Sequence, residues 1–169
     1  MYFNQFPTID YDVTGDGTTT TITDLLLRVK VRDYIKENRS WFAKYVVEHD
    51  ETPEMVAFKI YGQAAYHWVV LLFNQVINPY YGWPLKRKDF FNFINDKYSN
   101  PSAVHHYEIS QQSGNTTVMI TVESDVAGAI EVTNQEYEEA IQQNLRKVRI
   151  LKPTYLGQFR SEFETLIAQ

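Results

Sequence analysis

The sequence predicts a mixed α+β fold, in which short helices and short strands follow one another along a single chain. Apolar residues recur at the spacing of one helical face in residues 24–38, 86–98 and 134–146. Other segments are short and rich in β-branched and aromatic residues, as strands are. With 44% hydrophobic and 15% aromatic residues, the 169-residue chain can bury the core of one domain with elaborations.

We expect four consecutive regions. Residues 1–22 form an extended N-terminal arm, and residues 23–98 hold a helix, a compact core and a following helix. Residues 99–133 form a β-hairpin region, and residues 134–169 form a helix-strand-helix region. The arm contains glycines and a threonine tract but no periodic pattern, so we expect it to depend on another surface for its order.

Composition excludes several classes of protein. A net charge of -5 with only short basic runs argues against a nucleic-acid partner. The absence of cysteine excludes a disulfide framework and cysteine-ligated zinc. The most apolar run, from Trp68 to Phe73, is far shorter than the ~20 residues of a membrane-spanning helix, and the first residues lack the features of a secretory signal. We therefore expect no membrane partner.

The core region begins with local signals for a helix and a strand. The helix at residues 24–38 is followed by Trp41–Glu48, a run of aromatic and β-branched residues that predicts a strand. The pair Thr52-Pro53 then begins a second helix, because threonine caps helices and proline is tolerated at the first helical position.

A further helix follows the second one almost directly. Gly62 is a plausible left-handed residue at the end of the preceding helix, and the next helix ends near Asn74. Both sides of this helix are apolar, so it should be largely buried. The turn-rich loop at residues 78–85 is expected to lead into a short second strand.

The second half of the chain gives clearer signals. Residues 86–98 predict a helix, and the alternating runs Val104–Ile109 and Thr117–Glu123 predict a β-hairpin. Thr133 and Glu136 form a capping box, which predicts a helix at about 134–146. The strand Lys147–Leu151 follows, and Pro153 begins a last amphipathic helix. We attribute the acidic residues at the start of helix 134–146, which are Glu136, Glu138 and Glu139, to the helix dipole.

Ten apolar residues are candidates for contact with a partner protein. They lie in the arm, in the loop after the buried helix and on one face of the last helix: Phe3, Phe6, Ile9, Tyr11, Tyr80, Tyr81, Trp83, Tyr155, Phe159 and Phe163. For the three loop aromatics, packing against neighbouring helices and stacking on a sugar are alternative interpretations.

The sequence offers no recognisable catalytic, cofactor or metal site. It contains no phosphate-binding glycine loop and no H-E-x-x-H or G-x-S-x-G motif. The start of an EF-hand loop at Asp10 is not completed, because its twelfth position is Thr21 rather than glutamate. His105 and His106 are adjacent in a predicted strand, so their side chains should point to opposite faces and not share a metal. We therefore expect no enzymatic activity and no cofactor.

Residues 45–85 resemble the LysM module. The resemblance is carried by Asp50-Glu51-Thr52 before the first short helix, Tyr61-Gly62 between the helices, Asn74 at the end of the second helix, and Ile77 and Pro79 after it. It implies a β-α-α-β core, and LysM modules bind N-acetylglucosamine polymers. The chain has His49-Asp50-Glu51-Thr52 where the family has Gly-Asp-Thr.

A longer resemblance covers most of the chain. The segments FPTIDYD, ITDLLLRVKVRDYIKENRSWF, IYGQAAYHWVVLLFNQVINPYYGW and NLRKVRILKP, in this order, are similar to a family of small baseplate wedge proteins of T-even-type contractile-tailed bacteriophages. The resemblance implies a virion structural subunit that bridges or clamps wedge proteins and is present in multiple symmetry-related copies. It also implies contact with the core helical-bundle wedge proteins, a position near the sheath-initiating subunit, and assembly in the host cytoplasm.

Three interpretations of function therefore compete. The first is a structural subunit of a phage tail baseplate wedge. The second is a peptidoglycan-binding LysM module, and the third is a hydrolase. The resemblance over most of the chain and the lack of a catalytic set favour the first.

Overall fold

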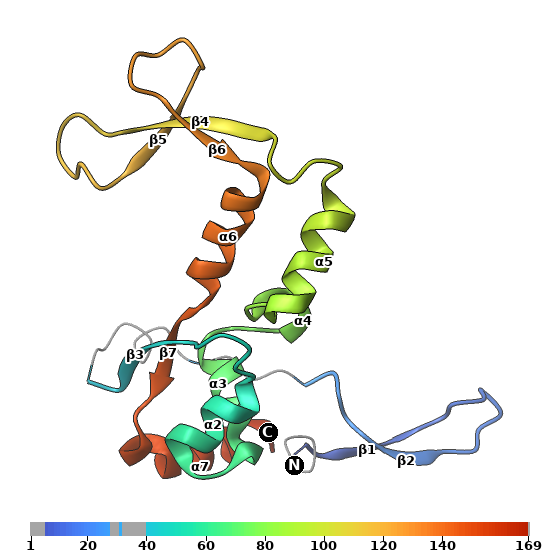
Figure 1. The fold of residues 1–169 in the computed structure, drawn as a ribbon. Coiled ribbons are helices and arrows are strands. Elements are labelled where there is room, and N and C mark those ends of the chain that lie inside the picture. Colours follow the sequence, from blue (N-terminus) through green and yellow to red (C-terminus); the bar gives the residue numbers. More distant parts are fainter. Residues whose placement is uncertain (1–5, 28–30, 32–39, 169) are drawn as a thin grey trace. The chain divides into compact units, whose positions relative to one another are not determined.

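The computed structural model describes residues 6–27, 31 and 40–168 and has a mixed α+β fold, as predicted (Figure 1). These residues form two compact units. Unit 1 comprises the described parts of Met1–Val47, Glu51–Gly82 and Val148–Gln169; unit 2 comprises Glu48–Asp50 and Trp83–Lys147. The helix predicted at residues 24–38 lies largely outside the described residues.

Two helices of unit 1 begin or end at the capping residues that the sequence analysis identified. Helix α2 (Pro53–Tyr61) begins after Thr52, whose side chain accepts a hydrogen bond from the Met55 N–H, and ends at Gly62 with a φ of 74°. A 3-10 turn at Ala64–Tyr66 leads into α3 (His67–Phe73), and Asn74 ends that helix. The predicted order of two short helices is confirmed.

The hydrophobic core of unit 1 is largely aromatic. Trp68 and Phe73 of α3 pack against the last helix, α7 (Leu156–Ile167), which follows a 3-10 turn at Pro153–Tyr155. The Trp68 ring centroid is 4.7 Å from that of Phe163 and 6.3 Å from that of Phe159. The apolar face of the last helix is therefore covered by the chain's own core.

The strand that completes the sheet of unit 1 comes from late in the sequence. Strand β3 (Phe42–Val46) pairs with β7 (Lys147–Leu151), and both were predicted as strands. No strand follows the loop at residues 78–85, where we expected one: the loop contains the short helix α4 (Pro79–Gly82), and another helix begins at Arg87. Most of unit 2 lies between α3 and β7 in the sequence, so it interrupts the order β3-α2-α3-β7.

The N-terminal arm is folded into a hairpin, which the sequence analysis did not predict. Strands β1 (Thr8–Tyr11) and β2 (Thr20–Thr23) are antiparallel, with Ile9 opposite Ile22 and Tyr11 opposite Thr20. Asp12 orders the connecting loop, because its carboxylate accepts backbone hydrogen bonds from Thr14, Gly15 and Gly17. These hydrogen bonds, that of Gly17 first, lower the pKa of Asp12. The region predicted as an extended arm therefore contains two strands that pair with each other.

Unit 2 combines two helices with a three-stranded antiparallel sheet. Helix α5 (Arg87–Lys97) is followed by β4 (Val104–Ser110), β5 (Met119–Val122) and β6 (Ile130–Thr133), in the spatial order β5-β4-β6. The β4–β5 hairpin is confirmed, whereas β6 was not predicted. Helix α6 (Asn134–Leu145) begins with the predicted capping box of Thr133 and Glu136.

Glu138 has a different role from the one that we inferred. Its side chain is buried, and its Oε1 accepts hydrogen bonds from the Lys97 ammonium at 2.5 Å and the Tyr98 hydroxyl at 2.8 Å. The bond to Glu138 raises the pKa of both Lys97 and Tyr98. Glu138 therefore joins α6 to the end of α5 rather than only complementing the helix dipole.

Within the described part of the chain, no helix combines the length and the apolar character needed to cross a membrane.

Candidate protein-interaction surfaces

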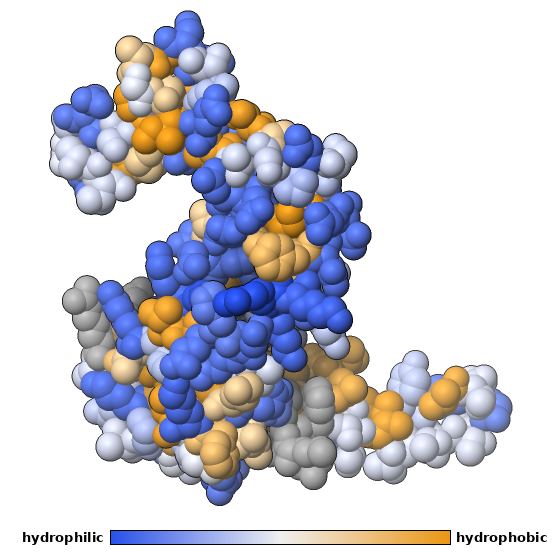
Figure 2. All heavy atoms as spheres, in the orientation of Figure 1, coloured by the Kyte–Doolittle hydropathy of each residue, from blue (hydrophilic) through white to orange (hydrophobic). Residues whose placement is uncertain are grey.

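The N-terminal hairpin has one apolar face and one polar face. Residues opposite each other in an antiparallel pair share a face, and so do alternate residues of a strand. Ile9, Tyr11 and Ile22 therefore lie on one face, and all three are exposed. On the other face, the Thr21 hydroxyl donates to Asp10 at 2.7 Å. Apolar residues are visible along this hairpin in Figure 2. We call this face the hairpin surface.

A second surface is formed by the loop between α3 and α5. Ile77, Tyr80 and Tyr81 are 75%, 85% and 84% exposed. We call these three residues the aromatic loop. Its backbone is well ordered by hydrogen bonds: the Asn78 side chain accepts from the Tyr80 N–H at 3.0 Å, and the Asn78 carbonyl accepts from the Tyr81 and Gly82 N–H groups.

Close packing also fixes the shape of the aromatic loop. A Cβ atom at Gly82 would come within 2.9 Å of the Val76 side chain, so a larger residue could not take this position without movement. Two large aromatic side chains are thus presented to solvent on a preformed backbone. Such groups lose little conformational entropy on binding, and tyrosine is enriched at the centres of protein interfaces.

A third surface lies on the sheet of unit 2. Apolar residues gather over β4, β5 and β6 in Figure 2. The exposed members of this group, which we call the sheet surface, are Val104, Val118, Met119, Ile120 and Ile130. Adjacent residues of a strand point to opposite faces, so the sheet surface has two sides: Met119 and Ile130 lie on one face, and Ile120 lies on the other. Exposed apolar residues gathered on one small sheet are candidates for contact with a partner.

The histidine pair does not lie as we predicted. The pairing of β4 with β6 is irregular between Val104 and His106, and both imidazoles consequently lie on the same side, with their Nδ1 atoms 2.8 Å apart. His105 also stacks on Tyr137, with ring centroids 3.9 Å apart, and His106 Nε2 lies 2.8 Å from Glu108. The expected separation of the two rings was wrong, because a regular strand was assumed. No group of three or more potential metal ligands occurs among the described residues.

A buried carboxylate beside α2 is also engaged in structural contacts. Both oxygens of Glu51 accept from the Tyr45 hydroxyl, at 2.8 and 2.9 Å, and Lys59 lies 3.6 Å away. The pKa of Tyr45 is raised, mainly because burial of the hydroxyl disfavours its charged form. This group joins β3 to α2.

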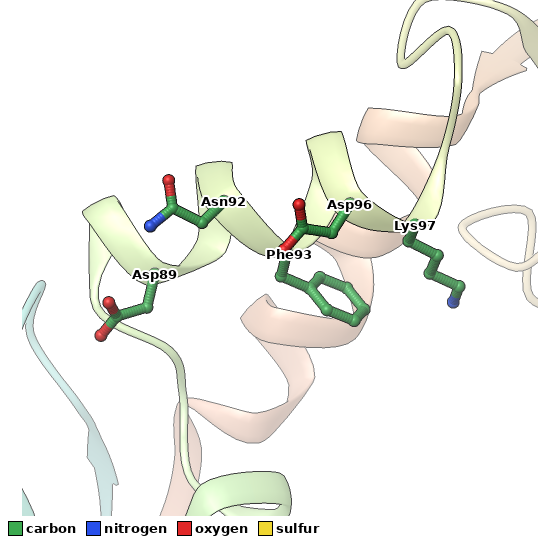
Figure 3. Close-up of a pocket in the computed structure, with 5 residues that line it drawn as sticks. All are labelled: Asp89, Asn92, Phe93, Asp96 and Lys97. Atoms are coloured by element: carbon green, nitrogen blue, oxygen red, sulfur yellow. The ribbon is translucent and has the colours of Figure 1, made fainter.

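A shallow hollow lies along one face of α5. It has a volume of about 470 Å³ and is lined by Asp89, Asn92, Phe93, Asp96 and Lys97, all from the same helix (Figure 3). Asp89 and Asn92 stand apart along the helix, and the Lys97 side chain extends away from the carboxylates. The side chains do not converge on a common point, as the groups of a catalytic site would.

Eight of the ten predicted contact residues fall into an exposed group and a buried group. Ile9, Tyr11, Tyr80 and Tyr81 are exposed. Phe6, Trp83, Phe159 and Phe163 are buried at 8%, 6%, 7% and 2% exposure, so they are not available to a partner in this conformation. Tyr155 is half-buried and stacks on Trp41 at a centroid distance of 4.5 Å. Phe3 lies outside the described residues.

Other exposed residues were missed by the sequence analysis. Ile22 belongs to the hairpin surface only through its pairing with Ile9, and Ile77 completes the aromatic loop. Ile130 lies in a strand that was not predicted. The hydrophobicity of these residues was visible in the sequence, but no local pattern distinguished them from core residues.

Two comparisons with known proteins point to the same class. A family model described as "Base plate wedge protein 53" matches residues 1–116. The chain is also 30% identical over 105 residues to the "Baseplate wedge protein gp53" of Enterobacteria phage T4. This alignment covers 59% of the chain and 53% of the relative, so the chain spans about half the length of the curated relative that it matches.

These similarities define a structural protein of a phage tail baseplate wedge. The chain belongs to the baseplate wedge protein 53 family.

Proposed function

We propose that this chain bridges neighbouring proteins of the baseplate wedge and holds them together during assembly. The observation that carries the proposal is the distribution of exposed apolar residues. The hairpin surface and the aromatic loop belong to unit 1, and the sheet surface belongs to unit 2. A protein with separate surfaces on two folded units can contact more than one neighbour.

The hairpin surface is the strongest of the three as a partner contact. A two-stranded hairpin is marginally stable alone, because each strand has only one neighbour and one face of the hairpin remains exposed. Ile9, Tyr11 and Ile22 are positioned to be covered when another protein packs on this face. We propose the core helical-bundle proteins of the wedge as this partner, with the sheath-initiating subunit nearby. Assembly would take place in the host cytoplasm, with several symmetry-related copies in each virion.

Two contacts favour this role over peptidoglycan binding. The loop that LysM modules use for N-acetylglucosamine polymers corresponds to residues 49–52. Here the Asp50 carboxylate accepts a hydrogen bond from the Arg87 N–H at 2.7 Å, and His49 lies against Arg146. Both loop residues are therefore engaged by other parts of unit 2. Titration with chitin oligomers or muropeptides tests the alternative, and saturable micromolar binding would support it.

The bridging role is tested by removing the apolar face of the hairpin without removing its strands. In the double variant Ile9→Thr, Ile22→Thr, both positions keep a β-branched residue. We expect the isolated protein to keep its circular dichroism spectrum, while phage carrying the variant accumulate unjoined wedges visible by sedimentation and electron microscopy. The matched control is Thr8→Ser, Thr23→Ser, a cross-strand pair on the other face.

The control should assemble normally. Complete baseplates in normal yield from the apolar-face variant would contradict the proposal for the hairpin. The corresponding test of the aromatic loop is Tyr80→Ser, Tyr81→Ser, with the same readout.

A further inference from the structure

A second hollow in unit 2 has a different chemical character from the apolar surfaces. It has a volume of about 340 Å³ and lies between the start of α5 and the last turns of α6. Leu85, Phe90 and Phe91 supply an apolar part of its lining. Arg87, Arg146 and His49 supply the basic part, and Glu139 is the one carboxylate in the lining. We call this hollow the arginine pocket.

The walls of the arginine pocket are fixed by hydrogen bonds. The Leu85 N–H donates to Gln142 Oε1 at 2.8 Å, which joins the segment before α5 to α6. Asp50 adopts a left-handed backbone conformation, with a φ of 63°, and accepts a hydrogen bond from the Arg87 N–H. A non-glycine residue in this region is strained, so its persistence indicates that the surrounding contacts hold it there. His49, the residue before Asp50, lies beside Arg146.

The two guanidinium groups have no carboxylate partner among the residues that the structure describes. Among the described residues, no ion pair joins Arg87 or Arg146 to an acidic side chain, although Glu139 lines the same pocket. The Glu139 carboxylate instead accepts from the Gln135 side chain at 2.8 Å. Arg146 approaches both ring nitrogens of His49, at 3.2 and 2.5 Å. A neutral imidazole has only one acceptor nitrogen, so only one of these approaches is a hydrogen bond.

We propose that the arginine pocket binds an acidic peptide segment of a neighbouring protein, with a carboxylate on Arg87 and Arg146 and an adjacent apolar side chain on Leu85 and Phe91. Charge complementarity selects the carboxylate, because guanidinium groups bind it through paired N–H donors. The exposed Phe91 ring and the half-buried Leu85 select a peptide over a simple anion, since they offer an apolar contact beside the charges. The inference rests on the proposed function only in taking the neighbour to be a wedge protein.

The test uses the isolated chain labelled with ¹⁵N and the peptide Ac-Gly-Leu-Glu-Glu-Leu-Gly-NH₂. We expect saturable shifts of the Leu85 and Arg87 amide signals and of the Arg146 side-chain signal. The same peptide with both glutamates replaced by glutamine should bind more weakly. Raising the salt concentration from about 0.05 M to about 0.5 M should also weaken binding, because exposed charges are screened.

Variants locate the site. Arg87→Gln and Arg146→Gln should each raise the Kd about two- to fivefold, the effect of removing one exposed charge pair. The matched control is Lys88→Gln, which removes the same charge from the next residue of α5 but does not line the pocket. It should leave the Kd unchanged. The amide spectrum of each variant reports whether the fold is retained.

Three results would overturn the inference: equal binding of the glutamine peptide, an equal loss of affinity in Lys88→Gln, or binding of inorganic phosphate at the same residues at least as tight as that of the peptide. The last result would assign a simple anion site instead. Because the titration needs no baseplate, an absence of peptide binding would not contradict the bridging proposal. Normal baseplate assembly by the hairpin variant, which would contradict that proposal, would likewise not contradict peptide binding in the arginine pocket.

Discussion

The Asn74 side chain makes two hydrogen bonds to the backbone of Arg149, a residue 75 positions later in the chain. Asn74 Nδ2 donates to the Arg149 carbonyl, and the Arg149 N–H donates to Asn74 Oδ1, both at 2.8 Å. The Asn74 side-chain amide thus donates one hydrogen bond to the β7 backbone and accepts one from it, as the backbone of a neighbouring strand would. These two bonds hold the end of α3 against β7.

Asn74→Ala should destabilise the protein by about 1–3 kcal/mol, because it leaves partly buried backbone donor and acceptor groups without partners. Chemical denaturation, followed by tryptophan fluorescence, measures the change in the free energy of unfolding. Asn95→Ala, at an exposed position of α5, is the control and should change it by less than about 0.5 kcal/mol. Equal effects of the two substitutions would contradict the role assigned to Asn74.

Trp68→Ala should cost about 3–5 kcal/mol, because the indole is 5% exposed and packs on Phe159 and Phe163. This is a large share of the stability of an ordinary domain, so the yield of soluble protein should also fall. Phe58→Ala removes an aromatic ring that is 65% exposed on α2 and should have a small effect on the melting temperature. An unchanged melting temperature in Trp68→Ala would show that the indole is not part of the core.

Glu138→Ala should destabilise unit 2 by about 1–2 kcal/mol, since it removes the acceptor shared by Lys97 and Tyr98. The loss is limited because Lys97 is partly exposed and can be hydrated. Hydrogen exchange of the α5 and α6 amides should become faster. Glu139→Ala, at the next and exposed position, should leave exchange unchanged, and equal effects at both positions would argue against a specific role of Glu138.

The capping box should make stability depend on pH. The Glu136 carboxylate accepts hydrogen bonds from the Thr133 N–H and hydroxyl, and these bonds, that of the backbone first, lower the Glu136 pKa below its ordinary value of 4.5. A lowered folded-state pKa contributes stability above the unfolded pKa, and this contribution is lost as the pH falls through the folded pKa.

The difference in stability between the wild-type protein and Glu136→Ala should therefore be largest near pH 7 and shrink below pH 4.5. Thermal unfolding measured across this range checks the prediction. Glu136→Gln keeps an acceptor without titrating, so its melting temperature should vary less with pH than that of the wild type. A difference that does not change with pH would contradict the role of the ionised carboxylate.

Local signals explain why much of the secondary structure was predicted. The cap at Thr52, the left-handed Gly62 and the capping box at Thr133 each act within a few residues, so the sequence alone is enough to locate them. Strands β3 and β7 were also recognised individually. Their pairing was not, because a strand pattern does not identify its partner across a long separation.

The candidate contact surfaces were only partly predictable for the same reason. The face of α7 that holds Phe159 and Phe163 is amphipathic in the sequence, but amphipathicity does not show whether the cover is the chain's own core or another protein. Tyr80 and Tyr81 were identified because they lie on a turn-rich loop. The hairpin surface depends on the register of β1 and β2, and the arginine pocket depends on Asp50 reaching α5; neither is a local property.

The pairing of β3 with β7 also constrains how the protein folds as it is synthesised. Strand β3 leaves the ribosome before most of unit 2, whereas its partner at Lys147–Leu151 emerges only after residues 83–146 have been synthesised. Residues 83–147, which form most of unit 2, are contiguous in the sequence. They can therefore fold before β3 has a partner strand to pair with. An unpaired β3 edge would meanwhile be exposed to other nascent chains, so translation that stalls before Lys147 should yield a product that is prone to aggregation.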